Sequence, residues 1–208
     1  MEFRLLYDGE LRPTANKSHP EETHKARRAF HPQLRRLWNM NHSLRQLAAQ
    51  KALHAYADKP NFPSHEEARV QLGFKAIGEN WNRANFDFVP LVTPELVLRC
   101  SFDILLLRPE EQRFIFKQGD IDGQLKALID ALRMPKDAKE AGGIGPQDDE
   151  HPFFCLLEND NLITEVKVTS DQLLLLPHEK TLKANDVFAV IHVRLNHRNA
   201  RTFDNYFG

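Results

Sequence analysis

Long apolar runs are missing from this sequence of 208 residues. Its apolar runs, such as the leucine-rich stretches 104–107 and 173–176, are at most five residues long, whereas a membrane-spanning helix needs about 20 apolar residues. The first ten residues include an acid at position 2 and contain no apolar core. We therefore expect no signal peptide, no association with a membrane and a cytoplasmic location.

Cysteine is also scarce, because Cys100 and Cys155 are the only two in the chain. One disulfide is conceivable, but two reduced thiols are expected in the cytosol. Two cysteines are too few for a zinc site built from cysteine alone. The glycines at 142, 143 and 145 lack the lysine and the helix start that follow in a phosphate-binding loop. These absences remove several common classes of enzyme site.

A charge excess of either sign is absent, since the formal net charge is −1. The distribution is uneven, however. Residues 1–50 hold nine Lys/Arg and five Asp/Glu, and residues 136–160 hold two Lys and seven Asp/Glu. A basic first quarter and an acidic later segment suit a protein that holds a polyanion together with a metal ion. Ordinary solvated surfaces vary by as much, so both interpretations stay open.

The apolar pattern predicts a mixture of helices and strands. Helical spacing of apolar residues predicts helices over 32–57 and 121–133. Alternating or continuous apolar segments predict strands over 2–9, 69–78, 84–92, 95–108, 113–117, 162–168 and 186–195. Polar stretches with proline or glycine predict loops over 12–29, 58–68 and 136–152.

The order of these segments predicts the fold class. Helices and strands alternate without a regular βαβ rhythm, and the chain shows no internal repeat. We therefore expect an α+β fold, in which helices pack on a mixed β-sheet. A length of 208 residues fits a single domain over 1–208.

The densest group of charges lies in the predicted helix whose sequence is GDIDGQLKALIDAL, at 119–132. At 100° per residue, one side of this helix forms an apolar stripe. A neighbouring row carries Asp122, Lys126 and Asp130, each one turn after the last. Asp120 lies at the first turn, close to Asp122. Two acids at one helix end repel each other unless a cation lies between them.

Two interpretations fit these acids. In the structural one, an aspartate caps the helix start and Asp122, Lys126 and Asp130 form a ladder of surface ion pairs. In the functional one, the acids bind a hard divalent ion, since Mg²⁺ is commonly held by one or two carboxylates plus substrate phosphates. A second acidic group, Glu158-Asn159-Asp160, precedes a predicted strand and reads either as a simple turn or as a further ligand.

Taken in order, these motifs resemble the RusA-type Holliday-junction resolvases. The resemblance lies in Asp120-Ile121-Asp122, in Lys126 four residues later, in Asp130-Ala131-Leu132, and in Asp160 before an apolar strand. The stretch 12–17, RPTANK, before a long helix is similar to the family's early loop. The resemblance runs from about residue 2 to residue 170.

The resemblance implies a function and a set of site residues. It implies a RusA-like fold, a bacterial or prophage origin, and a homodimer that cleaves phosphodiesters in branched DNA with Mg²⁺, for which Mn²⁺ can substitute. Asp120, Asp122 and Asp160 would be the metal ligands, and Lys126 would complete the catalytic group. The candidates for contact with the DNA backbone are Asn16, Lys17, Lys25, Arg27 and Arg28. Because a four-way junction has two-fold symmetry, a two-fold dimer presents one site to each of two strands.

The sequence also departs from the family pattern. Gly123 and Asn159 stand where the family usually has Asn and Asp, respectively. The loop 136–152 is an insertion relative to the family, and the chain from about residue 170 is a C-terminal extension. These departures favour an alternative, in which the chain is a catalytically weak or inactive RusA-like domain that binds nucleic acid or a protein partner.

Overall fold

The computed structural model describes residues 1–13, 19–109, 120–174 and 185–197, and at Asp120 and His197 it describes the backbone alone. Its helices are α1 (Pro20–Met40), α2 (His42–Tyr56), α3 (Glu66–Asn80) and α4 (Asp120–Leu132), with a short 3₁₀ turn at Asp160–Leu162. Its strands are β1 (Glu2–Glu10), β2 (Asn82–Arg83), β3 (Phe86–Val92), β4 (Leu98–Arg108), β5 (Phe153–Leu157), β6 (Ile163–Gln172) and β7 (Asp186–His197).

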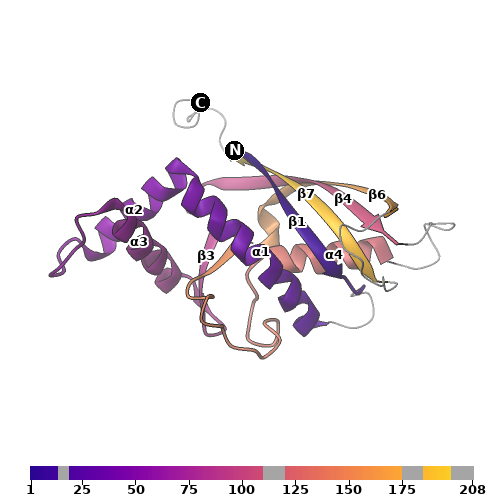
Figure 1. Cartoon of the computed structure of the whole chain (residues 1–208), viewed down its shortest axis with the longest axis horizontal. Coiled ribbons are helices and arrows are strands. Elements are labelled where there is room, and N and C mark those ends of the chain that lie inside the picture. Colours follow the sequence, from indigo (N-terminus) through magenta and orange to yellow (C-terminus); the bar gives the residue numbers. More distant parts are fainter. Residues whose placement is uncertain (14–18, 110–119, 175–184, 198–208) are drawn as a thin grey trace.

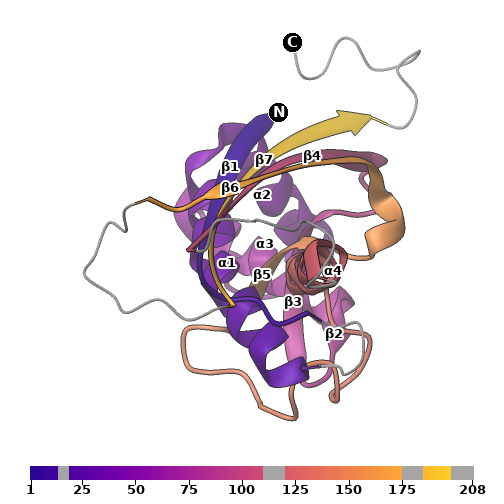
Figure 2. The ribbon, with the colours of Figure 1, turned by 90° about the vertical axis from the view of Figure 1, so that its right-hand side faces the viewer.

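A four-stranded mixed sheet forms one layer of the molecule, with the strand order β1-β7-β4-β6. β7 runs antiparallel to both of its neighbours, while β4 and β6 are parallel and are linked through α4. A smaller sheet has the order β2-β3-β5. Figure 2 shows α1 and α4 on the same side of the larger sheet. The expected α+β fold, with helices packed on a mixed sheet, is confirmed (Figure 1).

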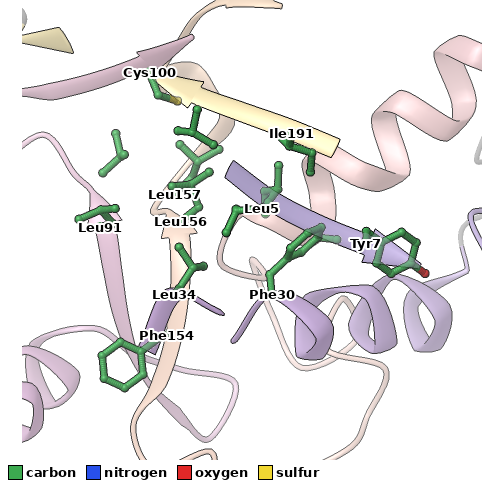
Figure 3. Packing of buried hydrophobic residues seen from close by; sticks show 14 of the residues in the cluster. Leu5, Tyr7, Phe30, Leu34, Leu91, Cys100, Phe154, Leu156, Leu157 and Ile191 are labelled. Atoms are coloured by element: carbon green, nitrogen blue, oxygen red, sulfur yellow. The ribbon is translucent and has the colours of Figure 1, made fainter. Parts of the chain in front are cut away.

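The main core lies between the larger sheet and α1. Alternate residues of β1 and β7, such as Leu5 and Ile191, point toward the helices and are fully buried. Phe30 and Leu34 of α1 and Leu156 of β5 meet them from the other side (Figure 3). One face of the sheet packs on the core, so apolar and polar residues alternate along β1 and β7. This alternation is the pattern from which the strands were predicted.

The first long helix differs from the prediction, since it begins at Pro20 and not near residue 32. Pro20 occupies the first turn, where backbone N–H groups have no partner within the helix, so its missing N–H costs nothing. Glu21 and Glu22 interact favourably with the positive end of the helix dipole. Pro32 is tolerated inside α1. The predicted helix 32–57 is in fact divided at Asn41, whose side chain caps α2 by accepting a hydrogen bond from the N–H of Leu44.

The strand predicted over 69–78 is wrong, because this segment belongs to α3. Val70, Phe74 and Ile77 follow helical spacing and are buried together. Gly73 lets α3 approach α2 closely, since a Cβ at this position would lie 1.9 Å from the carbonyl oxygen of Ala48. Gly73 therefore marks a close contact between two helices.

The later part of the chain is mostly as expected. α4, β6 and β7 match their predicted segments, and 136–152 contains no helix or strand. β7 lies between β1 and β4, so this part of the predicted C-terminal extension is an integral strand of the sheet. The strand predicted over 113–117 lies outside the described residues. Cys100 and Cys155 are free and buried, which confirms the expectation of two thiols.

The described helices include none with the length and apolar character that a membrane crossing requires.

Candidate functional site

Helix α4 carries most of the predicted site. Its apolar side is buried through Ala127, Leu128, Ala131 and Leu132, which contact the main core. The helix ends where the backbone N–H of Met134 donates to the carbonyl of Leu157 in β5, at 2.9 Å. In chain order α4 follows β4 and precedes β5, and β5 leads through the 3₁₀ turn into β6. The end of α4 therefore lies beside the end of β5.

The N-terminal half of α4 exposes two charges of opposite sign. Asp122 and Lys126 are both exposed and lie one turn apart. Neither makes an ion pair or a hydrogen bond with another side chain in the described part of the chain. The predicted ladder of ion pairs from Asp122 through Lys126 to Asp130 is therefore absent. The backbone of Asp120 begins the helix, and its side chain lies outside the described residues.

The C-terminal half of α4 has a different arrangement, centred on Arg133. The guanidinium of Arg133 contacts Asp130 Oδ1 from Nη2 at 2.7 Å and from Nε at 2.9 Å. It also donates from Nη1 to Glu140 Oε2 at 2.9 Å. The side chain of Arg133 is only 6% exposed. Asp130 is thus a helix-end residue bound by Arg133, and it is not the partner of Lys126.

These contacts shift the acid–base properties of the cluster. Burial lowers the pKa of Arg133, but its bonds to Glu140 and Asp130 more than offset that effect, so its pKa is raised. Burial likewise opposes ionisation of Glu140, and the hydrogen bond from Arg133 overcomes it, so the pKa of Glu140 is lowered. Each partner stabilises the charged form of the other.

Asp160 lies at this same C-terminal end. It follows β5 by three residues, and its Oδ2 is 3.9 Å from Nε of Arg133. Its side chain is 50% exposed. Asp122 precedes Asp130 by two turns, which is about 12 Å along a helix axis. The structure therefore brings Asp160 together with Asp130 and Glu140, and it does not place Asp160 beside Asp122.

The described residues contain no group of three or more histidine, cysteine, aspartate or glutamate side chains that could hold a metal ion. Asp120, whose side chain is outside that description, is the one predicted ligand not covered by this statement. The carboxylates at the start of α4 remain candidates for a site with few protein ligands.

Asn159 serves the turn before β6. Its side chain accepts a hydrogen bond from the N–H of Asn161 at 3.1 Å, which caps the 3₁₀ turn at Asp160–Leu162. The predicted turn is confirmed, and an aspartate at this position could accept the same bond. The departure from the family pattern at residue 159 therefore leaves the local backbone satisfied. Gly123, the other departure, is buried within α4.

The residues predicted to contact DNA are dispersed. Asn16 and Lys17 lie outside the described residues. Lys25 is exposed on α1, as a phosphate contact would require. Arg28 is bonded to the buried carboxylate of Glu150, with 2.7 Å between Nε and Oε1. This pair attaches the 136–152 segment to α1.

Arg27 is a correction to the prediction, because it is 1% exposed and is turned away from solvent. Its Nη2 donates to the carbonyl of Asp130 at 2.8 Å, and its Nε donates to the carbonyl of Arg133 at 3.0 Å. Burial lowers the pKa of Arg27 to about 10. The guanidinium thus satisfies carbonyls at the negative end of α4, which has no basic residue in its own last turn.

Two buried histidines of α1 make hydrogen bonds in the same part of the molecule: His24 contacts Arg27, and His31 contacts β5 and the 136–152 segment. His24 Nδ1 lies 3.1 Å from Nη1 of Arg27, which has only N–H groups to offer, so this nitrogen accepts. Burial and the nearby arginines lower the pKa of His24 to about 4. His31 Nδ1 accepts from the N–H of Phe154 at 2.8 Å, and its Nε2 contacts the carbonyl of Asp149 at 3.2 Å. Burial lowers the pKa of His31 as well, so both rings are neutral near pH 7.

The buried roles of Arg27, His24 and His31 were missed in the sequence because α1 was expected to begin too late. With a start at Pro20, the positions 24, 27, 31 and 34 fall on one side of the helix. That spacing is the signal that could have marked Arg27 as buried. Its partners, however, are 103 to 106 residues away in the chain, and no local pattern identifies them.

Comparison with known proteins assigns no family to this arrangement, since the chain matches no family model, no curated protein and no solved structure.

Proposed function

We propose that this chain is a divalent-metal-dependent endodeoxyribonuclease that acts on branched DNA, with its site at the first two turns of α4. The observation that supports this proposal is the exposed and unpaired state of Asp122 and Lys126 within the described part of the chain. At this spacing the two side chains could form an ion pair worth about 0.2–0.5 kcal/mol, and within the described part of the chain they do not. These two are available to a ligand, and Asp120 begins the same turn.

The residue types fit the chemistry. Asp120 and Asp122 would hold Mg²⁺ or Mn²⁺, since such an ion is commonly bound by one or two carboxylates plus substrate phosphates. The bound ion would supply a more acidic water and would stabilise charge on the phosphate. Lys126 would contact a phosphate oxygen as a point charge. The positive end of the α4 dipole would favour the same anion.

Asp160 is the residue on which the resemblance and the geometry diverge. The family pattern makes it a third ligand, whereas in this chain its carboxylate is near Arg133 at the other end of α4. We therefore assign the essential carboxylates to Asp120 and Asp122. Replacement of Asp160 by asparagine tests this assignment, because it should leave cleavage largely intact.

The test is cleavage of synthetic four-way junctions with Mg²⁺ and with Mn²⁺. Wild type should produce paired, symmetric nicks, as expected for a homodimer on a two-fold junction. Asp122→Asn should abolish them, while the matched control Asp58→Asn, at an exposed position after α2, should not. Absence of cleavage by wild type, under conditions in which the junction is bound, would contradict the proposed activity.

A second candidate is a domain that binds nucleic acid or a protein partner without cleaving. It is favoured by the Arg133 cluster, in which a guanidinium already neutralises Asp130 and Glu140 and lies near Asp160. Junction binding that is unchanged by Mg²⁺ and by Asp122→Asn, with no cleavage, would support this candidate.

A further inference from the structure

The two edge strands of the larger sheet, β1 and β6, differ in their contacts with the rest of the molecule. β1 forms one edge, and the side chain of Gln33 in α1 binds the backbone at its centre. Gln33 Oε1 accepts from the N–H of Leu6 at 2.9 Å, and Gln33 Nε2 donates to the carbonyl of Leu6 at 2.7 Å. These two bonds imitate a neighbouring strand and block further pairing at this edge.

β6 forms the other edge, and among the described residues no side chain binds the backbone at its centre as Gln33 does in β1. It is ten residues long, and within the described part of the chain only β4 pairs with it. Most of its side chains are exposed. A long edge strand with open backbone groups is a template for pairing with another strand.

We propose that β6 pairs antiparallel with β6 of a second copy of this chain, about a two-fold axis at Val166. In this register Val166 faces its own copy, and Thr164 faces Val168. Val166 is 36% exposed, although it is an apolar residue next to the core-facing Phe102 of β4. Pairing would bury it against an identical side chain and would join two sheets into one.

Charge complementarity selects this register. With the axis at Val166, Glu165 of each copy lies directly opposite Lys167 of the other, on the face of the sheet away from the helices. Lys167 Nζ is already 3.5 Å from Asp103 Oδ2 of its own chain. Glu165 is exposed and has no ion pair with another described residue. Dimerisation would therefore give Glu165 an ion-pair partner.

Neighbouring registers fit less well. An axis at Glu165 or at Lys167 would set like charges directly opposite each other, which destabilises an antiparallel pair. An axis at Val168 would place Glu165 opposite Asp171. An axis at Thr169 would pair Lys167 with Asp171, but Val166 would then face Gln172. Of these registers, only the axis at Val166 places Glu165 opposite Lys167 and also places Val166 opposite another apolar residue.

This inference does not depend on nuclease activity, so each can fail without the other. Its direct test is disulfide cross-linking of Val166→Cys under mild oxidation. Residues directly opposite in an antiparallel pair have Cα atoms about 4.5–5.5 Å apart, which suits a disulfide. The matched control is Val168→Cys, because it changes the same residue type on the same face. Its copy would be four residues out of register, about 14 Å away.

We expect Val166→Cys to become a covalent dimer and Val168→Cys to remain mostly uncross-linked. Wild type is the blank, since Cys100 and Cys155 are buried. Equal cross-linking of both variants would overturn the register. A wild-type mass that stays at 24.1 kDa in sedimentation equilibrium at high concentration would overturn the dimer itself.

A charge reversal provides the second test. Glu165→Lys should raise the dissociation constant of the dimer about tenfold, because two like-charge contacts replace two opposite ones. Asp58→Lys makes the same change of charge at an exposed site outside β6 and should leave the constant unchanged. An equal effect of the two substitutions would contradict pairing through β6.

Discussion

The two ends of α4 carry acidic residues in very different surroundings. At the C-terminal end, Asp130 is bound by Arg133, and the carbonyls of the last turn are bound by Arg27. At the N-terminal end, Asp122 and Lys126 are exposed and make no ion pair with the described residues. The same sequence motif thus contains acids of two kinds.

The different surroundings indicate different roles for the acids at the two ends of α4. An acid whose lone pairs are taken up by a nearly buried arginine stabilises the fold and has little capacity for a metal ion. An acid left exposed near a helix start adds little to stability and is available to a cation. We therefore interpret the C-terminal end of α4 as structural, and its N-terminal end is the site at which we propose metal binding.

The largest predicted effect is on the structural end. Arg27→Met should lower the free energy of unfolding by about 3 kcal/mol, because it leaves two buried carbonyls of α4 without donors. Lys25→Met changes an exposed cation on the same helix and should alter stability by less than about 0.5 kcal/mol. Urea denaturation measures both. Similar values for the two variants would refute the structural role of Arg27.

Acidification should weaken the same end. The folded pKa of His24 is about 4, below its ordinary value of 6.5, so the unfolded chain binds the proton more readily. Stability that is present at pH 7 should fall by about 2 kcal/mol by pH 5 from this residue alone. His31 acts in the same direction. His24→Gln should flatten the dependence of the unfolding free energy on pH, and an unchanged slope would contradict the assignment.

A smaller effect is expected at the Arg133 cluster. Arg133→Met should lower the free energy of unfolding by about 1–2 kcal/mol, since Asp130 and Glu140 are partly exposed and can be hydrated once the guanidinium is gone. Arg133→Lys should recover part of the loss, because a single ammonium cannot contact both carboxylates with a planar fork. Thermal unfolding at constant pH measures the series. Full recovery by lysine would show that the fork geometry is unimportant.

The smallest effect on stability is expected at the N-terminal end of α4. Asp122→Asn and Lys126→Met should each change the free energy of unfolding by less than about 0.5 kcal/mol without added metal. A loss as large as that of Arg133→Met would mean that this end is structural too, and the contrast between the ends would disappear.

The sequence predicted α4 well because its apolar stripe and charged row have an unambiguous helical period. It predicted β4 and β7 from their continuous or alternating apolar residues. It placed the start of α1 too late, because Pro20 was taken as a loop residue when it is the first residue of the helix. This one boundary concealed the buried roles of His24 and Arg27.

The candidate site was predictable only in part. The exposure of Asp122 and Lys126 follows from their position on the helix. The location of Asp160 does not, because it depends on how β5 lies against the end of α4, a contact between residues 133 and 157. The contact between Arg28 and Glu150 spans 122 residues and could not be read from local patterns either.

The most direct test of this contrast is a titration with Mn²⁺ followed by thermal unfolding, comparing wild type, Asp122→Asn and Asp130→Asn in the same buffer. A ligand that binds only the folded state raises the melting temperature with its concentration. We predict a rise for wild type and Asp130→Asn, and none for Asp122→Asn. No rise in wild type, or an equal rise in Asp122→Asn, would contradict a metal site at the start of α4.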